Sequence, residues 1–169
     1  PRLLDTRPDR PVMIAGAAVL VAALLGLCLW TLVYGVQWGV LLVGWGIIGM
    51  GYSTVLTPSG RLLKRSAHPE DRPAVYAAQF ALSHACWLVT YPLAGGLITV
   101  AGPAAAFAVL ALLAAMGLIG GIILWRQEDC DAVAHSHPEL AADHPHVQQG
   151  QPHRHPILID DLHPQWPRG

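Results

Sequence analysis

The sequence is short of charged residues. Asp, Glu, Lys and Arg make up 12% of its 169 residues, whereas soluble domains carry about 25%. Residues 12–60 and residues 74–125 contain none of the four. Each stretch is about twice as long as the ~20 residues that an α-helix needs to cross a bilayer. Because a soluble domain needs charge on its surface, this deficit excludes a soluble globular protein.

Cysteine and the usual catalytic motifs are scarce or absent as well. Cys28, Cys86 and Cys130 show no CxxC spacing and give no sign of a disulfide framework. The sequence has no nucleophile–base pair, phosphate-binding loop, dinucleotide fingerprint or HExxH motif, so an enzyme is the class we expect least. The net charge of −1, without a large basic patch, predicts no nucleic-acid partner.

What the sequence does contain is apolar and divides into four pieces. Residues 35–37 break the first uncharged stretch, and Gly102-Pro103 breaks the second. An apolar segment inside a bilayer must be helical, because no water is present to hydrogen-bond its backbone. We therefore predict an all-α polytopic membrane fold with four transmembrane helices in two hairpins, spanning about residues 12–34, 38–57, 74–101 and 103–125.

The charges that remain give an orientation. Lys and Arg in short loops mark the cytoplasmic side of a membrane, and the two hairpin turns carry none. Basic residues instead precede the first span and fill the connection between the second and third: Arg2, Arg7, Arg10, Arg61, Lys64, Arg65 and Arg72. We therefore expect an inner-membrane protein with a cytoplasmic loop at residues 1–11, a cytoplasmic central loop and cytoplasmic N- and C-termini.

The second predicted span is rich in glycine and is expected to end before Pro58-Ser59-Gly60. Gly35-x-x-x-Gly39 fits the small-xxx-small pattern of closely packed helices. The glycines either let this helix press against a neighbour or make it a flexible gating helix. The sequence alone does not separate these two interpretations.

Residues 126–169 have a different character from the spans. They are rich in His, Pro, Gln and acidic residues, and such a segment cannot bury enough apolar surface to offset the entropy of ordering it. We therefore predict a largely disordered cytoplasmic tail. Residues 157–162 are an apolar exception, which we expect either to dock on the membrane domain or to form a short turn of helix.

Seven of the nine histidines lie in this tail, six of them in three His-x-His pairs. Neutral imidazole is a common ligand for Ni, Co, Zn and Cu, so the tail is predicted to bind a divalent transition metal; no other cofactor is expected. The alternative is a solvated, low-complexity tail that binds metal only incidentally. The predicted ligands are His135, His137, His144, His146, His153, His155 and His163.

One histidine lies inside a predicted span. Ionisable residues at such positions are costly and tend to face a bundle interior or a water-filled path. The spacing places His84 with Tyr91, and Gln79 with Ser83 and Cys86. We predict a substrate path at Gln79, Ser83, His84 and Tyr91. The alternative is hydrogen bonding between helices, which polar residues in spans commonly supply.

Four features of residues 1–127 carry a resemblance to a known family. They are the short Arg/Asp loop at residues 5–11, the Gly-rich second span, the basic segment PSGRLLKR at residues 58–65, and the long third span entered through Glu70-Asp71-Arg72-Pro73. This layout resembles the ninth to twelfth helices of a major facilitator superfamily transporter. The tail resembles the His-rich tails of nickel- and heavy-metal-resistance exporters in that superfamily.

The resemblance implies a twelve-helix secondary transporter with two six-helix halves and alternating access to a central site. The chain opens with Pro1 and is expected to be part of one half of a proton-coupled exporter with a metal-binding tail. Its expected partners are the lipid bilayer, the missing N-terminal helices, and a small solute or metal ion. The alternatives are a drug or metabolite exporter with an incidental tail, and a non-transporting four-helix anchor that displays a metal-sensing tail.

Overall fold

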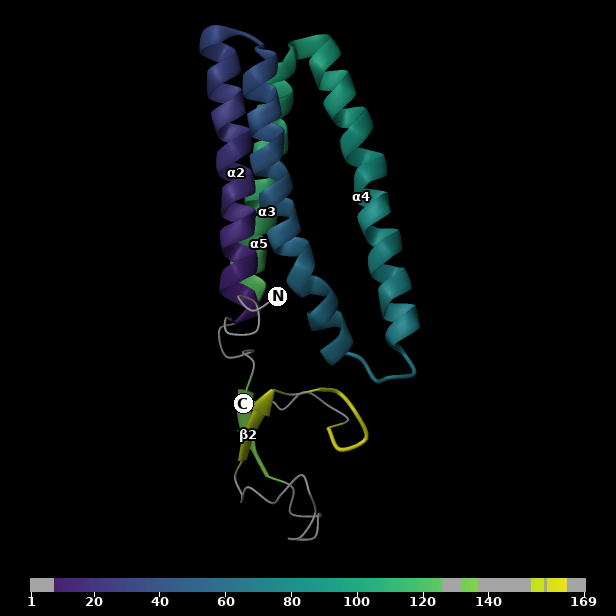
Figure 1. The fold of residues 1–169 in the computed structure, drawn as a ribbon. Helices are drawn as coiled ribbons and strands as arrows, with labels where there is room; N and C mark the ends of the chain where they lie inside the picture. Colours follow the sequence, from purple (N-terminus) through teal and green to yellow (C-terminus); the bar gives the residue numbers. More distant parts are fainter. Residues whose placement is uncertain (1–7, 126–131, 137–152, 157, 164–169) are drawn as a thin grey trace.

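The structure, a computed structural model, describes residues 8–125, 132–136, 153–156 and 158–163 (Figure 1). All four of its long helices are long and apolar enough to cross a membrane. The predicted all-α membrane fold with four helices is therefore confirmed. The helices are α2 (Asp9–Tyr34), α3 (Trp38–Arg65), α4 (Arg72–Ala101) and α5 (Pro103–Leu124).

The helices form two hairpins, with turns where the sequence predicts them. Residues 35–37 separate α2 from α3, and Gly102 alone separates α4 from α5. Gly35 and Gly102 have φ angles of 73° and 85°, a left-handed conformation that glycine adopts without a steric penalty. Both turns lie at one end of the bundle, while the start of α2, the α3–α4 connection and the end of α5 share the other (Figure 1).

α3 runs further than the predicted span. It continues through Pro58, whose side chain is fully buried, and ends at Arg65, so much of the predicted central loop is helical. The hydroxyls of Thr57 and Ser59 donate hydrogen bonds of 2.7 and 2.6 Å to backbone carbonyls of the preceding turn. Bonds of this kind often bend a helix, as does an internal proline. The lower part of α3 leans away from α2 (Figure 1).

α2 and α3 approach most closely at glycines. A Cβ added at Gly51 would lie 2.8 Å from the carbonyl oxygen of Gly16, and one added at Gly44 would lie 2.6 Å from Cδ2 of Leu27. Close packing of the Gly-rich helix is therefore confirmed at these two positions. The Gly35-x-x-x-Gly39 pattern is not the contact, because a Cβ at either glycine would meet no atom within 4 Å.

Large apolar side chains cover the outside of the bundle. Leu32, Leu88 and Val100 are 66%, 77% and 88% exposed, and α4 buries none of its residues within the described parts of the chain. A soluble monomer rarely exposes so much contiguous apolar surface. These faces therefore suit lipid or further helices.

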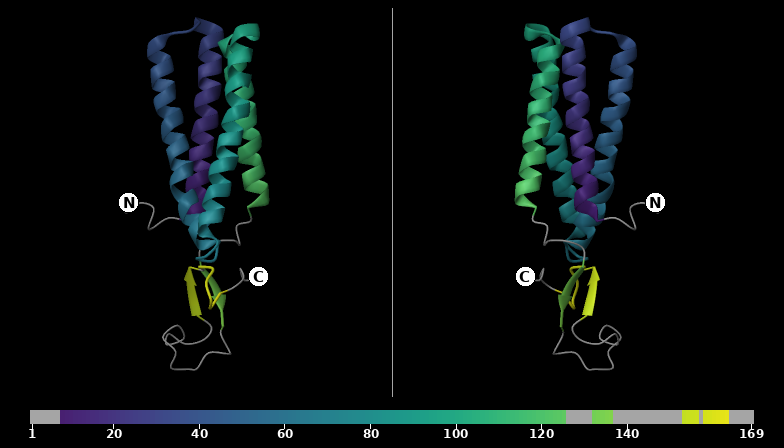
Figure 2. Two further views of the ribbon diagram at one scale, coloured as in Figure 1. Left: turned by 90° about the vertical axis from the view of Figure 1, so that its right-hand side faces the viewer. Right: turned by 90° about the vertical axis from the view of Figure 1, so that its left-hand side faces the viewer.

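Two short strands, which the sequence did not predict, lie below the helices in both views of Figure 2. β1 (Ala132–His135) and β2 (His153–Pro156) pair antiparallel. The register pairs His135 with His153 and Val133 with His155. The prediction of a disordered tail otherwise concerns residues that mostly lie outside the described ranges.

Gly51→Ala should destabilise the α2–α3 hairpin, because the added methyl group meets the Gly16 carbonyl. Overpacking of this kind costs about 1–3 kcal/mol, so the midpoint of thermal unfolding in detergent should fall. Gly49→Ala is the matched control, because a Cβ there meets open space. Equal midpoints for the two variants would contradict the close approach of the helices.

Candidate functional site

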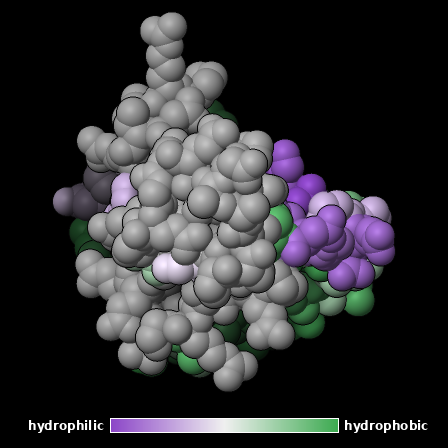
Figure 3. All heavy atoms as spheres, turned by 90° about the horizontal axis from the view of Figure 1, so that it is seen from below, coloured by the Kyte–Doolittle hydropathy of each residue, from purple (hydrophilic) through white to green (hydrophobic). Residues whose placement is uncertain are grey.

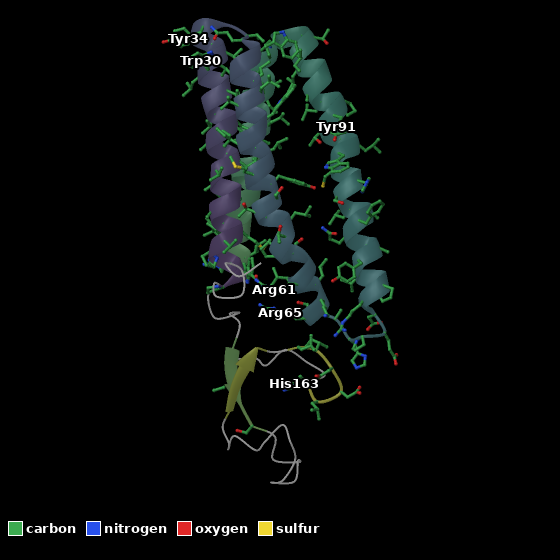
Figure 4. All side chains as sticks on the ribbon, viewed as in Figure 1. Trp30, Tyr34, Arg61, Arg65, Tyr91 and His163 are labelled. Atoms are coloured by element: carbon green, nitrogen blue, oxygen red, sulfur yellow. The ribbon has the colours of Figure 1, made fainter. Side chains whose placement is uncertain are left out.

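A buried carboxylate organises one end of the bundle, which we call the charged end and define by Asp9, Arg10, Arg61, Arg65 and Arg72. Asp9, the first residue of α2, is 3% exposed and forms an ion pair with Arg61 of α3. Nη1 of Arg65 lies 4.0 Å from Oδ2 of Asp9. Figure 4 shows both arginines between the lower ends of α2 and α3. The carboxylate therefore ties the end of α3 to the start of α2.

The next residue joins α2 to the end of α5. Nε of Arg10 donates a hydrogen bond of 2.9 Å to the carbonyl oxygen of Trp125, and Nη2 donates one of 3.2 Å to that of Ile122. The last carbonyls of a helix have no partner in their own helix, and a cation there interacts favourably with the helix dipole. Arg10 thus caps α5 from a neighbouring helix.

The start of α4 is bound to the end of α3. Nε of Arg72 donates hydrogen bonds of 3.1 and 3.3 Å to the carbonyl oxygens of Lys64 and Ala67. The hydroxyl of Tyr76 donates one of 2.8 Å to the carbonyl oxygen of Gly60. Seen from below, the hydrophilic residues gather at the edge where Figure 1 places the α3–α4 connection (Figure 3). This connection is therefore a fixed polar corner of the molecule.

Part of the tail returns to this corner. The N–H of Ile159 donates a hydrogen bond of 2.9 Å to the carbonyl oxygen of Arg65, the last residue of α3. Nε2 of His68, in the α3–α4 connection, donates one of 3.1 Å to Oδ1 of Asp161. Of the two alternatives for residues 157–162, these contacts show docking for the described residues 158–163, whereas residue 157 lies outside the described ranges. We call residues 158–163 the docked segment.

The docked segment closes on itself around Asp160. Oδ1 of Asp160 accepts hydrogen bonds from the N–H groups of Leu162 and His163 at 3.0 and 2.9 Å, and from Nδ1 of His163 at 3.0 Å. His163 is 7% exposed and lies below α3 (Figure 4). The structure therefore places this predicted metal ligand in the docked turn rather than in the strand pair.

These hydrogen bonds also shift the titration of Asp160. Burial opposes its charged form, but the bonds from His163 outweigh that effect, so the pKa of Asp160 lies below its ordinary value of 3.8. A lowered carboxyl pKa stabilises the folded form above the ordinary value, and this contribution is lost as the pH falls through the lowered one. Asp160 therefore holds the turn throughout the neutral range.

The predicted substrate-path residues all lie on α4. The His84 ring lies between those of Phe80 and Trp87, tilted to both, with centroids 3.9 and 4.7 Å away. Tyr91 stacks on Trp87 at 6.1 Å and extends this aromatic row. Nδ1 of His84 donates a hydrogen bond of 2.8 Å to the carbonyl oxygen of Phe80. His84 and Tyr91 are exposed.

The other two path residues lie on a separate, half-buried face of α4. The Ser83 hydroxyl donates to a backbone carbonyl of its own helix at 2.8 Å. Gln79 lies one turn earlier, and Thr90, which the sequence analysis did not single out, lies two turns later on the same face. The structure thus separates Gln79 and Ser83 from the row that contains His84 and Tyr91.

A cavity of about 310 Å³ lies between α2, α3 and α5, on the side of the charged end. Its lining is mostly apolar and includes Leu20, Tyr52, Val55, Leu118 and Trp125. None of the four predicted path residues lines this cavity.

The predicted metal ligands are only partly within the described residues. His135, His153 and His155 lie on the two strands, whereas His137, His144 and His146 lie outside the described residues. Among the residues that the structure describes, no three His, Cys, Asp or Glu side chains are grouped as a metal site would require.

Sequence reasoning missed the two residues that join α2 to α3 and α5. Arg10 entered only as a marker of orientation, and Asp9 had no assigned role. The available signal was the Asp9-Arg10-Pro11 sequence directly before an apolar span, because a carboxylate at a helix N-terminus is favourable. Their partners, Arg61 and Trp125, lie far away in sequence, and only packing brings them close.

The four spanning helices, with their charged connections gathered at one end, define a multi-pass helical membrane protein. Residues 2–157 match the family model of the Major Facilitator Superfamily. The chain belongs to this superfamily, whose members are transporters rather than enzymes. The match includes both strands of the tail. No curated protein and no solved structure matches the chain.

Asp9→Asn should destabilise the charged end, because two arginines then face an amide instead of a carboxylate. Removing one partner of a buried ion pair costs about 3–5 kcal/mol. We expect the low end of this range, because Arg61 is 40% exposed. The measurement is the yield of folded protein and its unfolding midpoint in detergent. Glu70→Gln removes an exposed carboxylate and should leave both unchanged; an equal effect of the two variants would contradict the role of Asp9.

Proposed function

We propose that the chain is the C-terminal four-helix part of a twelve-helix exporter, driven by the proton gradient, whose tail binds a divalent transition metal. Membership of the superfamily supports transport, because transporters of this kind alternate access to a site between two halves. The apolar faces of α4, none of whose residues is buried within the described chain, support contacts with further helices.

The charged end is the cytoplasmic end in this proposal. It contains four arginines, and Lys64 lies beside it at the end of α3, whereas the turns at residues 35–37 and Gly102 carry no charge. An excess of Lys and Arg in short connections marks the cytoplasmic side. Trp30 and Tyr34, with ring centroids 4.7 Å apart, lie at the opposite end (Figure 4) and suit an outer interface.

The observation that carries the metal-binding part is the register of the strand pair. His135 and His153 are register partners in the antiparallel pair. One histidine of the first His-x-His pair therefore lies opposite one of the third, although they are far apart in sequence. Imidazole is a suitable ligand for Ni, Co, Zn or Cu.

The proton-coupling part depends on His84. Its Nδ1 donates to a backbone carbonyl, so in the neutral ring Nε2 is the acceptor that can take up a proton. An ionisable side chain within a spanning helix is costly and suits a proton or solute path. We place the path along α4, with His84 and Tyr91 on one face and Gln79 and Ser83 on the other.

His84→Ala should abolish proton-driven transport by the full-length transporter while leaving its membrane insertion intact. The measurement is uptake into inverted vesicles with an imposed pH gradient, alongside the amount of protein in the membrane. Thr99→Ala is the control, because it removes a hydroxyl that bonds only to the backbone of the same helix. If His84 only bonds within its helix, transport should survive, and full activity of the alanine variant would refute its role in the path.

Replacing the six paired histidines by Ala, with His163 kept, should remove most metal binding by the full chain. Imidazole must be neutral to coordinate, so binding competes with protons around a pKa of ~6.5. Calorimetry should therefore detect Zn²⁺ or Ni²⁺ binding near pH 7.5 and little near pH 5. His84→Ala is the control and should bind normally. Cells with the six-histidine variant should show altered metal tolerance but retain transport.

No heat of binding at pH 7.5 would contradict a metal-binding tail. A transporter for an organic solute with an incidental tail would then be the better interpretation. Affinity in the test tube will not identify the physiological metal, because Cu²⁺ binds most tightly to such ligands whatever the role of the site.

A further inference from the structure

The docked segment binds the part of α3 that lies beyond Pro58. Pro58 interrupts the helix ladder, and the helix beyond it leans away from α2 (Figure 1). The segment contacts both sides of this end. It bonds to the carbonyl oxygen of Arg65 through the N–H of Ile159, and to His68 through Asp161.

Both contacts join chemically complementary groups. The Arg65 carbonyl belongs to the last turn of α3, where carbonyls receive no N–H donor from their own helix. The N–H of Ile159 donates a hydrogen bond to it, as a helix cap would. The contact between His68 and Asp161 joins an imidazole N–H to a carboxylate, which makes a stronger bond when the ring is charged. Since the turn around Asp160 presents both groups, the segment docks as a unit.

The docked segment also follows directly on the second strand. β2 ends at Pro156, and the segment begins at Leu158. The same strand carries His153, the register partner of His135 on β1. A ligand that holds β1 and β2 together would therefore also restrict the position of Pro156, two residues before the docked segment begins.

We propose that the tail is a metal-responsive clamp: metal bound at the strand pair favours docking of residues 158–163 on the end of α3. This coupling rests on the metal-binding tail of the proposed function and adds its consequence for the membrane domain. A metal ion that links β1 to β2 removes conformational freedom from the chain leading into the segment. Docking then has a smaller entropic cost, which is the usual benefit of preorganisation.

The proposal has a quantitative consequence. If metal raises the docking equilibrium by some factor, docking must raise the affinity for metal by the same factor, because binding free energies are reciprocal. A variant that cannot dock should therefore bind metal more weakly, even though all its histidines remain. A tail that binds metal independently of the membrane domain would show no such effect.

The test uses the full chain in nanodiscs, with the three native cysteines replaced and spin labels at the exposed positions Glu70 and Leu158. Distances between the labels report the docked fraction without metal and with Zn²⁺, which is diamagnetic. Calorimetry on the same samples gives the Zn²⁺ affinity. Ile159→Pro removes the N–H that bonds to Arg65, and Ile159→Ala keeps it. His68→Ala removes the other contact without changing the tail.

We expect Zn²⁺ to increase the docked fraction of the unchanged chain. Ile159→Pro and His68→Ala should each lower the docking equilibrium by about two- to tenfold, as expected for one hydrogen bond, and should weaken Zn²⁺ binding by no more than the factor measured for docking. Ile159→Ala should retain most of the docking and most of the Zn²⁺ affinity. The double variant His135→Ala, His153→Ala should dock without metal but should not respond to Zn²⁺.

The outcomes separate the clamp from the proposed function. Zn²⁺ binding with an unchanged docked fraction, and equal affinity in Ile159→Pro and Ile159→Ala, would overturn the clamp and leave the metal-binding tail intact. Absence of Zn²⁺ binding at pH 7.5 would overturn both.

Discussion

Inside a bilayer every backbone N–H and C=O must find its partner within the protein, and the arrangement of this chain depends on that constraint. It requires four helices across the apolar stretches. It also concentrates the unpaired groups of the helices at their ends. The charged side chains and the polar contacts between helices are accordingly concentrated at one end of the bundle.

At the charged end, those terminal groups are satisfied between helices rather than within them. Arg10 of α2 caps the carbonyls of α5, and Arg72 of α4 bonds to those at the end of α3. The N–H of Ile159 in the tail donates a hydrogen bond to the carbonyl oxygen of Arg65. At the charged end, each of these helix ends is thus held by another part of the chain.

The two hairpins differ in how firmly they are held. α2 and α3 meet at Gly16 and Gly51 with no room for a methyl group, which gives van der Waals contact over the backbone itself and suits a rigid pair. α4 has no buried residue within the described chain, and its polar and aromatic faces are open to whatever lies beside it.

The sequence by itself determined the class of fold, the number of helices and the position of both hairpin turns. These follow from missing charge and from Gly35 and Gly102, whose effects are local and need no knowledge of neighbours. For residues 157–162 the sequence left docking on the membrane domain and a short helical turn as alternatives, because both would cover an apolar segment in a polar tail. Only the tertiary structure decided which glycines make contact, that Asp9 pairs with Arg61, and that His135 lies opposite His153. Each of these depends on two segments far apart in sequence meeting in one register, and neither segment alone carries a signal for its partner.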